Sequence, residues 1–301
     1  MRWAAGAGLF DRAMKYITCI ALAAALLSAG CRRSKPVVVG SKPEPEQALI
    51  GEIVAQHLEH RLDTKIQRRL GLGGSEVLYS ALSSGDVTVY PEYTGTIASV
   101  ILKETASSDP ATVLERTRAE MLRVAQVELI GPMGFENPPV MVVRASSAQG
   151  AETLSDAAAG TTRWKIAVTF DFQQRSDGLP LLNEYHLPTG APVRSLEQSR
   201  LFQELEKDVV TMIAVDAIDG HLGSSDWKVL ADDKKVFKPQ QACFLVRQNS
   251  LTQEPRLREA LVELAGKMTQ NALRKLTANV VMDKLPPATV AGDFLASVGL
   301  R

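Results

Sequence analysis

The sequence carries no net positive charge that would attract a nucleic acid. It contains 34 lysine and arginine residues against 34 aspartate and glutamate residues. Removing residues 1–30, which are assigned below to a leader, takes away Arg2, Arg12, Lys15 and Asp11 and leaves a slight acidic excess. Because nucleic-acid-binding proteins present a basic face, we expect no nucleic-acid partner.

Cysteine is scarce, which bears on disulfides. Of three cysteines, Cys19 and Cys31 lie near the N-terminus and Cys243 stands alone. We therefore predict no intrachain disulfide in the mature protein. The apolar neighbours of Cys243 favour a small buried hydrophobic residue, and a reactive thiol is the alternative.

Motifs of catalytic and metal sites are missing as well. His57 and His60 share one predicted helix, near its polar face, but the pattern between them lacks the glutamate of a zinc protease. No Gly-x-Ser-x-Gly element is present. Gly71-Leu72-Gly73-Gly74-Ser75 lacks the lysine of a phosphate-binding loop, so it is either a plain turn or a row of amides that could hold a carboxylate. We predict no enzyme, no metal site and no cofactor.

The one long apolar run, from Ile17 to Leu27, lies near the N-terminus. A basic start, a short apolar run and small residues before a cleavage point are typical of a secretory signal. The run is too short to span a bilayer comfortably. We assign residues 1–30 to a signal peptide, with a possible start at Met14.

The end of that run, Leu27-Ser28-Ala29-Gly30-Cys31, resembles a bacterial lipobox. The resemblance implies that Cys31 becomes the lipidated N-terminus and that residues 31–36 are a tether. The alternative is an ordinary secretory signal followed by an incidental cysteine.

Short apolar strands alternate with helices along the rest of the chain. Residues 37–40 and 139–144 read as strands, and residues 46–62 read as a helix with one apolar stripe. Asp109-Pro110 supplies an N-cap and a proline at the first helical position, so we expect a helix to begin there. The alternation predicts an α/β fold with a largely parallel sheet. The mature chain is long enough for two lobes.

The most informative stretch is Tyr90-Pro91-Glu92-Tyr93-Thr94-Gly95-Thr96, at the end of a predicted strand. In α/β folds that edge is where ligands bind. The stretch closely resembles the signature of the osmoprotectant-binding proteins of ABC importers, which bind glycine betaine, choline or carnitine. The resemblance covers residues 37–301 and rests also on Gly40-Ser41-Lys42, Glu46-Gln47, Leu72-Gly73-Gly74, Arg175-x-Asp177-Gly178-Leu179-Pro180, Asp219-Gly220 and Leu276-Thr277-Ala278-Asn279.

The resemblance implies a two-lobe periplasmic-binding-protein fold of type II, with ligand in the cleft between the lobes. Lobe one would comprise residues 36–138 plus 243–301 and lobe two residues 139–242, with crossovers near 136–140 and 238–243. The implied partners are a small-molecule ligand, an ABC permease and its ATPase. The implied setting is the bacterial cell envelope, periplasmic or extracytoplasmic, where a monomer is anchored through Cys31.

Carried over residue by residue, the family's ligand site is only partly present. Lys42, Thr96 and Arg175 match groups that clamp a ligand carboxylate, and Tyr93 matches the first of four aromatic walls. Such walls hold a quaternary ammonium by cation–π attraction. Where the other three rings stand, this chain has polar residues or proline, and we add to the site Asn137, Asp216 and Gln240.

This departure predicts a different ligand. Acceptors in place of rings favour a small zwitterionic or amine-bearing solute with an N–H group. Two alternatives stay open: Asp216 lies outside the cleft, or other aromatic residues, Phe135, Phe172 or Tyr185, refill the box.

The predicted function is therefore that of a solute-binding lipoprotein of an ABC importer. One alternative is an envelope sensor or interaction module that no longer transports. Another is an enzyme on the same scaffold, for which Asp216 is the candidate general base.

Overall fold

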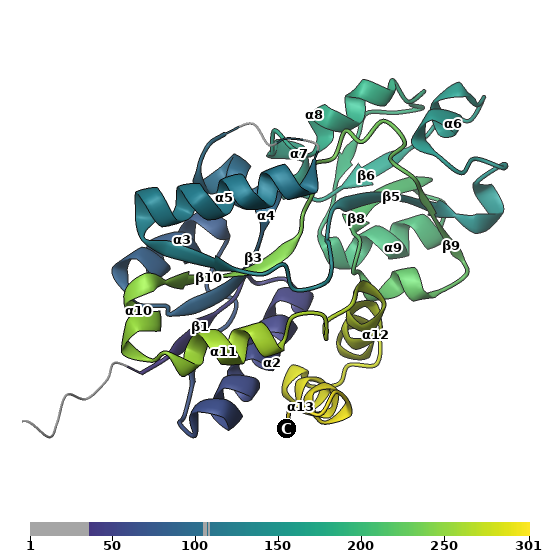
Figure 1. The fold of residues 1–301 in the computed structure, drawn as a ribbon. Helices are drawn as coiled ribbons and strands as arrows, with labels where there is room; N and C mark the ends of the chain where they lie inside the picture. Colours follow the sequence, from purple (N-terminus) through teal and green to yellow (C-terminus); the bar gives the residue numbers. More distant parts are fainter. Residues whose placement is uncertain (1–35, 105–106, 108) are drawn as a thin grey trace, which may run out of the picture. The chain divides into compact units, whose positions relative to one another are not determined.

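The computed structural model describes residues 36–104, 107 and 109–301. The predicted signal peptide and Cys31 lie outside these residues. The fold is the compact unit Val37–Arg301, and it contains two five-stranded sheets (Figure 1).

The first sheet has the strand order β2-β1-β3-β10-β4. Its strands are β1 (Val38–Gly40), β2 (Gln67–Arg69), β3 (Val89–Tyr93), β4 (Val127–Ile130) and β10 (Ala242–Arg247). The helical segments of the same part of the chain are α2 (Pro45–Leu62), α3 (Ser75–Ser84), α4 (Thr94–Thr96), η1 (Ile97–Ile101) and α5 (Pro110–Ala125). After β10 follow α10 (Gln248–Gln253), α11 (Arg256–Glu263), α12 (Gln270–Val281) and α13 (Pro287–Ser297).

The second sheet has the order β7-β6-β8-β5-β9. Its strands are β5 (Pro139–Arg144), β6 (Ile166–Val168), β7 (Arg194–Ser195), β8 (Met212–Asp216) and β9 (Trp227–Leu230). Its helical segments are η2 (Ala145–Ser147), α6 (Leu154–Ala159), α7 (Phe170–Gln174), α8 (Leu179–Leu182), η3 (Asn183–Tyr185), α9 (Gln198–Glu206) and η4 (Gly220–Gly223).

Both sheets are mixed, so the prediction of a largely parallel sheet is wrong. β1 runs parallel to β2 and β3, and β6 runs parallel to β7 and β8. β10 and β5, in contrast, are antiparallel to both of their neighbours. These two strands enter from the other sheet without an intervening helix, so the parallel strand–helix–strand connection does not constrain them.

Local signals in the sequence placed the helices well. Asp109 caps α5, accepting a hydrogen bond from the amide of Thr112, and Pro110 is the first helical residue. The apolar stripe predicted for α2 is buried, and Cys243 is fully buried as expected. His57 is a correction: it is fully buried on α2, with Nε2 2.9 Å from the carbonyl oxygen of Ala260. Burial lowers the pKa of its imidazole.

Helix α12 contacts helical segments that accompany each of the two sheets. It packs on η4 and also on α2 and α13 (Figure 1). A side chain at Gly220 would lie 2.5 Å from the amide nitrogen of Ala278, so only glycine permits this approach. Arg274 adds a hydrogen bond from Nε to the carbonyl oxygen of Ala217 at 2.7 Å. The assignment of residues 243–301 to lobe one alone stays a prediction.

Candidate ligand-binding site

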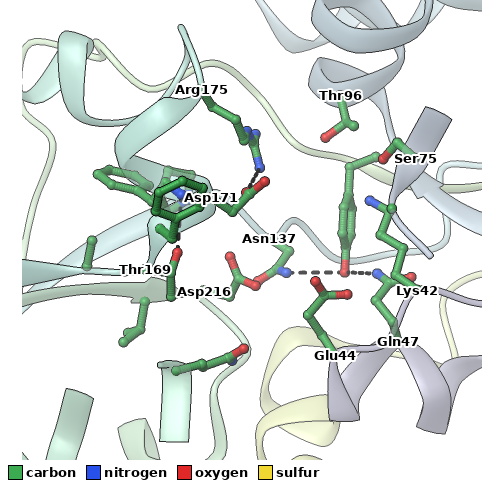
Figure 2. A pocket seen from close by; sticks show the side chains of 18 of the residues that line it. Lys42, Glu44, Gln47, Ser75, Thr96, Asn137, Thr169, Asp171, Arg175 and Asp216 are labelled. Carbon is green, nitrogen blue, oxygen red and sulfur yellow. Dashed lines mark hydrogen bonds and ion pairs between the residues drawn. The ribbon is translucent and has the colours of Figure 1, made fainter. Parts of the chain in front are cut away.

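A cavity of about 590 Å³ is lined by residues that belong to both sheets and their connections (Figure 2). The structure brings all seven predicted site residues together around it, namely Lys42, Tyr93, Thr96, Asn137, Arg175, Asp216 and Gln240. Asp216 therefore does not lie outside the cleft, as one alternative held. That these residues bind ligand stays a prediction.

Tyr93, the last residue of β3, is held rigidly at the cavity wall. Its hydroxyl accepts hydrogen bonds from Nε2 of Gln47 at 2.7 Å and from Nδ2 of Asn137 at 3.2 Å. Asn137 is itself fixed, because its Oδ1 accepts the amide of Ile218 at 3.1 Å. The rings of Phe135 and Tyr93 form a T-shaped pair, and the Lys42 ammonium lies 5.3 Å from the centroid of the Tyr93 ring. The one ring retained from the family's box thus already faces a cation of the protein.

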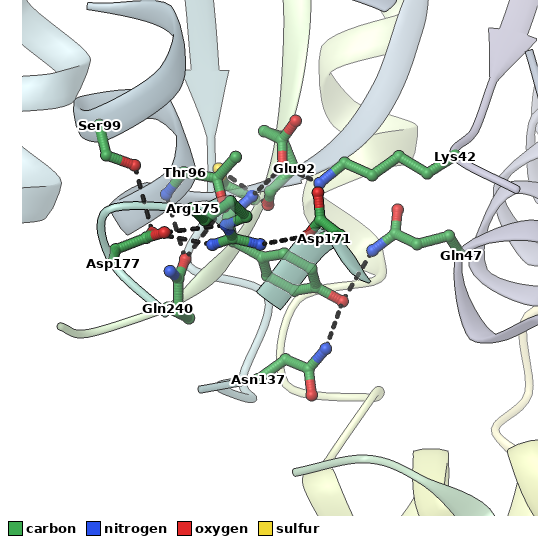
Figure 3. Close-up of polar contacts among 12 residues, drawn as sticks. Lys42, Gln47, Glu92, Thr96, Ser99, Asn137, Asp171, Arg175, Asp177 and Gln240 are labelled. Carbon is green, nitrogen blue, oxygen red and sulfur yellow. Dashed lines mark hydrogen bonds and ion pairs between the residues drawn. The ribbon is translucent and has the colours of Figure 1, made fainter. Parts of the chain in front are cut away.

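Lys42 also has a carboxylate partner inside the protein. Its Nζ lies 2.6 Å from Oε1 of Glu92, whose side chain is fully buried (Figure 3). The same oxygen accepts the amide of Tyr93 at 2.9 Å. The positive charge of Lys42 is therefore engaged before any ligand arrives.

Arg175 is engaged in the same way. Its Nε and Nη2 donate to the two carboxylate oxygens of Asp177, each at 2.8 Å, and its Nη1 lies 3.3 Å from Asp171 (Figure 3). Ser99 of η1 donates to Asp177 at 3.3 Å. The bidentate fork that was predicted for a ligand carboxylate holds a carboxylate of the chain.

Gln240 ties the turn after β3 in place. Its Oε1 accepts the amide of Thr96 at 3.1 Å and lies 3.4 Å from the Thr96 hydroxyl. Gly95 lets Gln240 come this close, because a Cβ there would lie 2.6 Å from the carbonyl oxygen of Pro239. Gln240 is 4% exposed, so the side chain that replaces an aromatic wall serves mainly to hold the loop.

Five carboxylates at the cavity have no ion-pair partner among the residues that the structure describes. Glu76 and Glu197 are exposed to water, whereas Glu46 is buried and Glu44 and Asp216 are half-buried. Burial raises the pKa of Asp216 to about 6, with a further rise from the charges of Glu44 and Asp219, against the opposing charges of Arg175 and Lys42. Burial, and next the charge of Asp216, raises the pKa of Glu46 well above its usual value. An unpaired carboxylate that is shielded from water is costly, which marks Glu44, Glu46 and Asp216 as incomplete without a partner.

The lining as a whole is acidic. Its only lysine and arginine, among the described residues, are Lys42 and Arg175, both already paired. Against them stand seven carboxylates, those of Glu44, Glu46, Glu76, Asp171, Asp177, Glu197 and Asp216. A cleft lined by one sign of charge concentrates ligands of the opposite sign, so this cavity favours a cation.

The sequence did not predict Glu44, Glu46, Gln47 or Phe170 as cavity residues. A signal was available for Glu46, which lies four residues before Ile50 and so on the buried stripe of α2. Of the three rings proposed to refill the box, Phe172 alone lines the cavity, and it packs against Phe237.

The chain matches the family described as the substrate binding domain of ABC-type glycine betaine transport system over residues 35–297. A relative in Helicobacter pylori (strain G27), the ergothioneine transport permease/ergothioneine binding protein EgtU, is 30% identical over 88% of this chain. The matched part is 48% of that relative, so the chain spans about half its length. The glycine betaine-binding protein YehZ of Escherichia coli (strain K12) is 26% identical over 91% of this chain and 94% of its own.

A solved structure of a glycine betaine/carnitine/choline ABC transporter protein superposes with a TM-score of 0.79 at 24% identity, covering 88% of this chain and 99% of that one. The predicted two-lobe fold of type II is thereby confirmed. Within the part of the chain that the structure describes, no helix is long and apolar enough to cross a membrane. Nor do the described residues include a cluster of three or more side chains suited to hold a metal ion.

Proposed function

Because this chain belongs to the family of substrate-binding domains of ABC-type glycine betaine transport systems, we propose that it captures a small solute with a protonated, N–H-bearing nitrogen. The chain is the substrate-binding protein of a betaine/carnitine-type ABC importer, and its family is one of solute-binding proteins and not a class of enzymes. The solute is what remains open. The observation that carries the proposal is the trio of buried or half-buried carboxylates without an ion pair, Glu44, Glu46 and Asp216, in a cavity whose cations are already neutralised.

An N–H group answers these carboxylates better than a quaternary ammonium does. Charge-assisted N–H···O hydrogen bonds are short and directional, whereas a quaternary ammonium has no donor and relies on aromatic faces. Here the single Tyr93 ring already faces Lys42. A ligand carboxylate, in turn, would have to displace Glu92 from Lys42 or Asp177 from Arg175. The site therefore supports the amine-bearing solute over the zwitterion of the sequence-based prediction.

Titration calorimetry at pH 7.5 tests the ligand class. We expect N,N-dimethylethanolamine, which is a cation with one N–H, to bind at least about tenfold more tightly than choline, glycine betaine, carnitine or ergothioneine, a difference of about 1.4 kcal/mol. If glycine betaine or carnitine binds more tightly than N,N-dimethylethanolamine, the ion pairs Lys42–Glu92 and Arg175–Asp177 open to admit a ligand carboxylate. Binding of none of these compounds would contradict the proposal.

We propose further that the lobes formed by residues 36–138 with 243–301 and by residues 139–242 close around this solute, which is then passed to a permease with its ATPase. Capture in a cleft by hinge closure is a common transition of two-lobe proteins. A monomer is sufficient for this mode of binding, since both walls of the cavity come from one chain.

Lipid on Cys31 would hold the protein at the bacterial membrane and raise its effective concentration near the permease. If so, Cys31→Ser expressed in a bacterial host moves the protein from the membrane fraction to the soluble extracytoplasmic fraction. Mass spectrometry of the wild-type N-terminus then finds a diacylglyceryl cysteine. An unchanged membrane fraction would contradict the anchor without touching the ligand proposal.

A further inference from the structure

Phe170 is an aromatic residue left open to the cavity. It begins α7 directly after Thr169, the N-cap, and its side chain is 68% exposed, the largest value among the exposed large apolar residues that the structure describes. It lines the same cavity as the predicted site. Exposed aromatic surface gains free energy when a ligand covers it, because apolar area leaves water.

The sheet places Phe170 at the same edge as Asp216. Strands β6 and β8 are parallel neighbours, with Ala167 opposite Ile213. The carboxyl ends of parallel neighbours meet at one edge of a sheet, so Phe170, two residues after the end of β6, and Asp216, the last residue of β8, emerge at the same edge. Both then line the cavity.

The other cavity rings are already occupied. Tyr93 faces the Lys42 ammonium, and Phe172 packs against Phe237 with ring centroids 6.1 Å apart. Phe170 has no ring contact and no cation above it among the described residues. Its face is thus available to a ligand.

We propose that Phe170 is a specificity-determining aromatic wall that selects an N-methylated secondary or tertiary amine. This inference rests on the proposed function and narrows its ligand class. The methyl groups of a protonated amine lie against the ring, which attracts the cation and covers the methyl surface. The remaining N–H donates a hydrogen bond to the carboxylate of Asp216 or Glu46. An aromatic ring cannot take the place of that acceptor. A quaternary nitrogen gains the ring contact and loses the hydrogen bond, whereas a primary amine does the reverse.

A graded ligand series separates the two effects. Ethanolamine, N-methylethanolamine, N,N-dimethylethanolamine and choline differ only in the number of methyl groups on the nitrogen. For the wild-type protein we expect affinity to rise about threefold with each of the first two methyl groups and to fall about tenfold with the third. Calorimetry at pH 7.5 measures all four.

Variants of Phe170 test the assignment. In Phe170→Ala the affinities of ethanolamine, N-methylethanolamine and N,N-dimethylethanolamine become equal within about twofold. The affinity of choline is still lower than theirs, because choline has no N–H group. In Phe170→Leu the gain in affinity over the first two methyl groups is less than half of the wild-type gain on a logarithmic scale. Leucine keeps an apolar surface but has no π face. Val229→Ala is the matched control, since Val229 is exposed on β9 away from the cavity, and it leaves the series unchanged. All three variants keep the melting temperature within a few degrees.

The outcomes distinguish this inference from the proposed function. If Phe170→Ala keeps the full wild-type gain in affinity over the first two methyl groups, Phe170 is not the wall that selects the ligand, while the amine proposal stands. A full rise in Phe170→Leu overturns the aromatic contribution. Choline as the tightest ligand of the wild type, or no binding of any of the four, overturns the proposed function and this inference with it.

Discussion

Replacing Asp216 by asparagine is expected to weaken binding of N,N-dimethylethanolamine by about 100-fold at pH 7.5. Removing one partner of a buried, hydrogen-bonded charge pair costs about 3 kcal/mol, which corresponds to that factor. Asparagine has nearly the same shape and keeps an acceptor, so the loss reports the charge. Titration calorimetry measures it.

Glu197→Gln is the matched control. Glu197 lines the same cavity and the substitution removes the same charge, but the residue is exposed, so water and salt screen it. We expect a change of less than about threefold. If both variants lose affinity to a similar extent, the summed negative charge of the cavity binds the cation, and not Asp216 in particular.

The pH dependence provides a second control on Asp216. Its pKa is raised to about 6, so the carboxylate is protonated over much of the range from pH 5 to 6 and ionised at pH 7.5. Affinity for choline, which is a cation at every pH, is expected to rise about tenfold from pH 5 to 7.5 in the wild-type protein. The rise is smaller in Asp216→Asn, where Glu46 is left as the titrating group.

The same shift sets the sign of the effect on stability. A carboxyl group with a raised pKa in the folded state contributes stability below its unfolded pKa, and that contribution is lost as the pH rises through about 6. Asp216→Asn removes the ionised group, so we expect its melting temperature at pH 8 to equal or exceed that of the wild type. A lower melting temperature would contradict the reading of Asp216 as an unpaired acid kept for binding.

Replacing Lys42 by methionine is expected to lower the free energy of unfolding by about 3 kcal/mol. The substitution leaves Glu92, which is fully buried, without its cation, and breaking a buried ion pair on one side is strongly destabilising. For a chain of this size the melting temperature should fall by roughly 6–12 °C. Thermal and denaturant unfolding measure both quantities.

The double variant Lys42→Met with Glu92→Gln is its control. Removing both charges should recover most of the loss, because a neutral glutamine can still accept the amide of Tyr93. If Lys42 serves chiefly to hold a ligand carboxylate, the single variant will instead unfold almost normally and lose affinity for glycine betaine or carnitine. The two roles therefore give opposite results.

Much of the fold was predictable because its signals are local. The Asp109 cap, the apolar stripe of α2 and strand β10 follow from caps and periodicity within a few residues. The error about parallel strands arose at β5 and β10, whose direction depends on a chain that passes between two sheets. The hydrophobic pattern of a strand does not indicate which sheet it joins or in which direction it runs.

The candidate site was predictable in part of its membership but not in its chemistry. Motif spacing alone placed Lys42, Tyr93, Thr96, Asn137, Arg175, Asp216 and Gln240 around one cavity. Motif spacing did not tell that Arg175 is engaged by Asp177, although the two residues stand only two positions apart. It also gave no warning that His57 is buried.

By itself, the sequence determined the family, the two-lobe α/β fold and seven of the residues that line the cavity, because each depends on residue types at fixed spacing. Only the tertiary structure decided which of their charges are free. Lys42 and Glu92 lie fifty residues apart and meet only in the folded chain, whereas Glu44, Glu46 and Asp216 meet no cation there. Charge pairing depends on distances of a few ångströms in a medium of low dielectric constant, and this is why the proposed ligand class depends on the fold as well as on the motif.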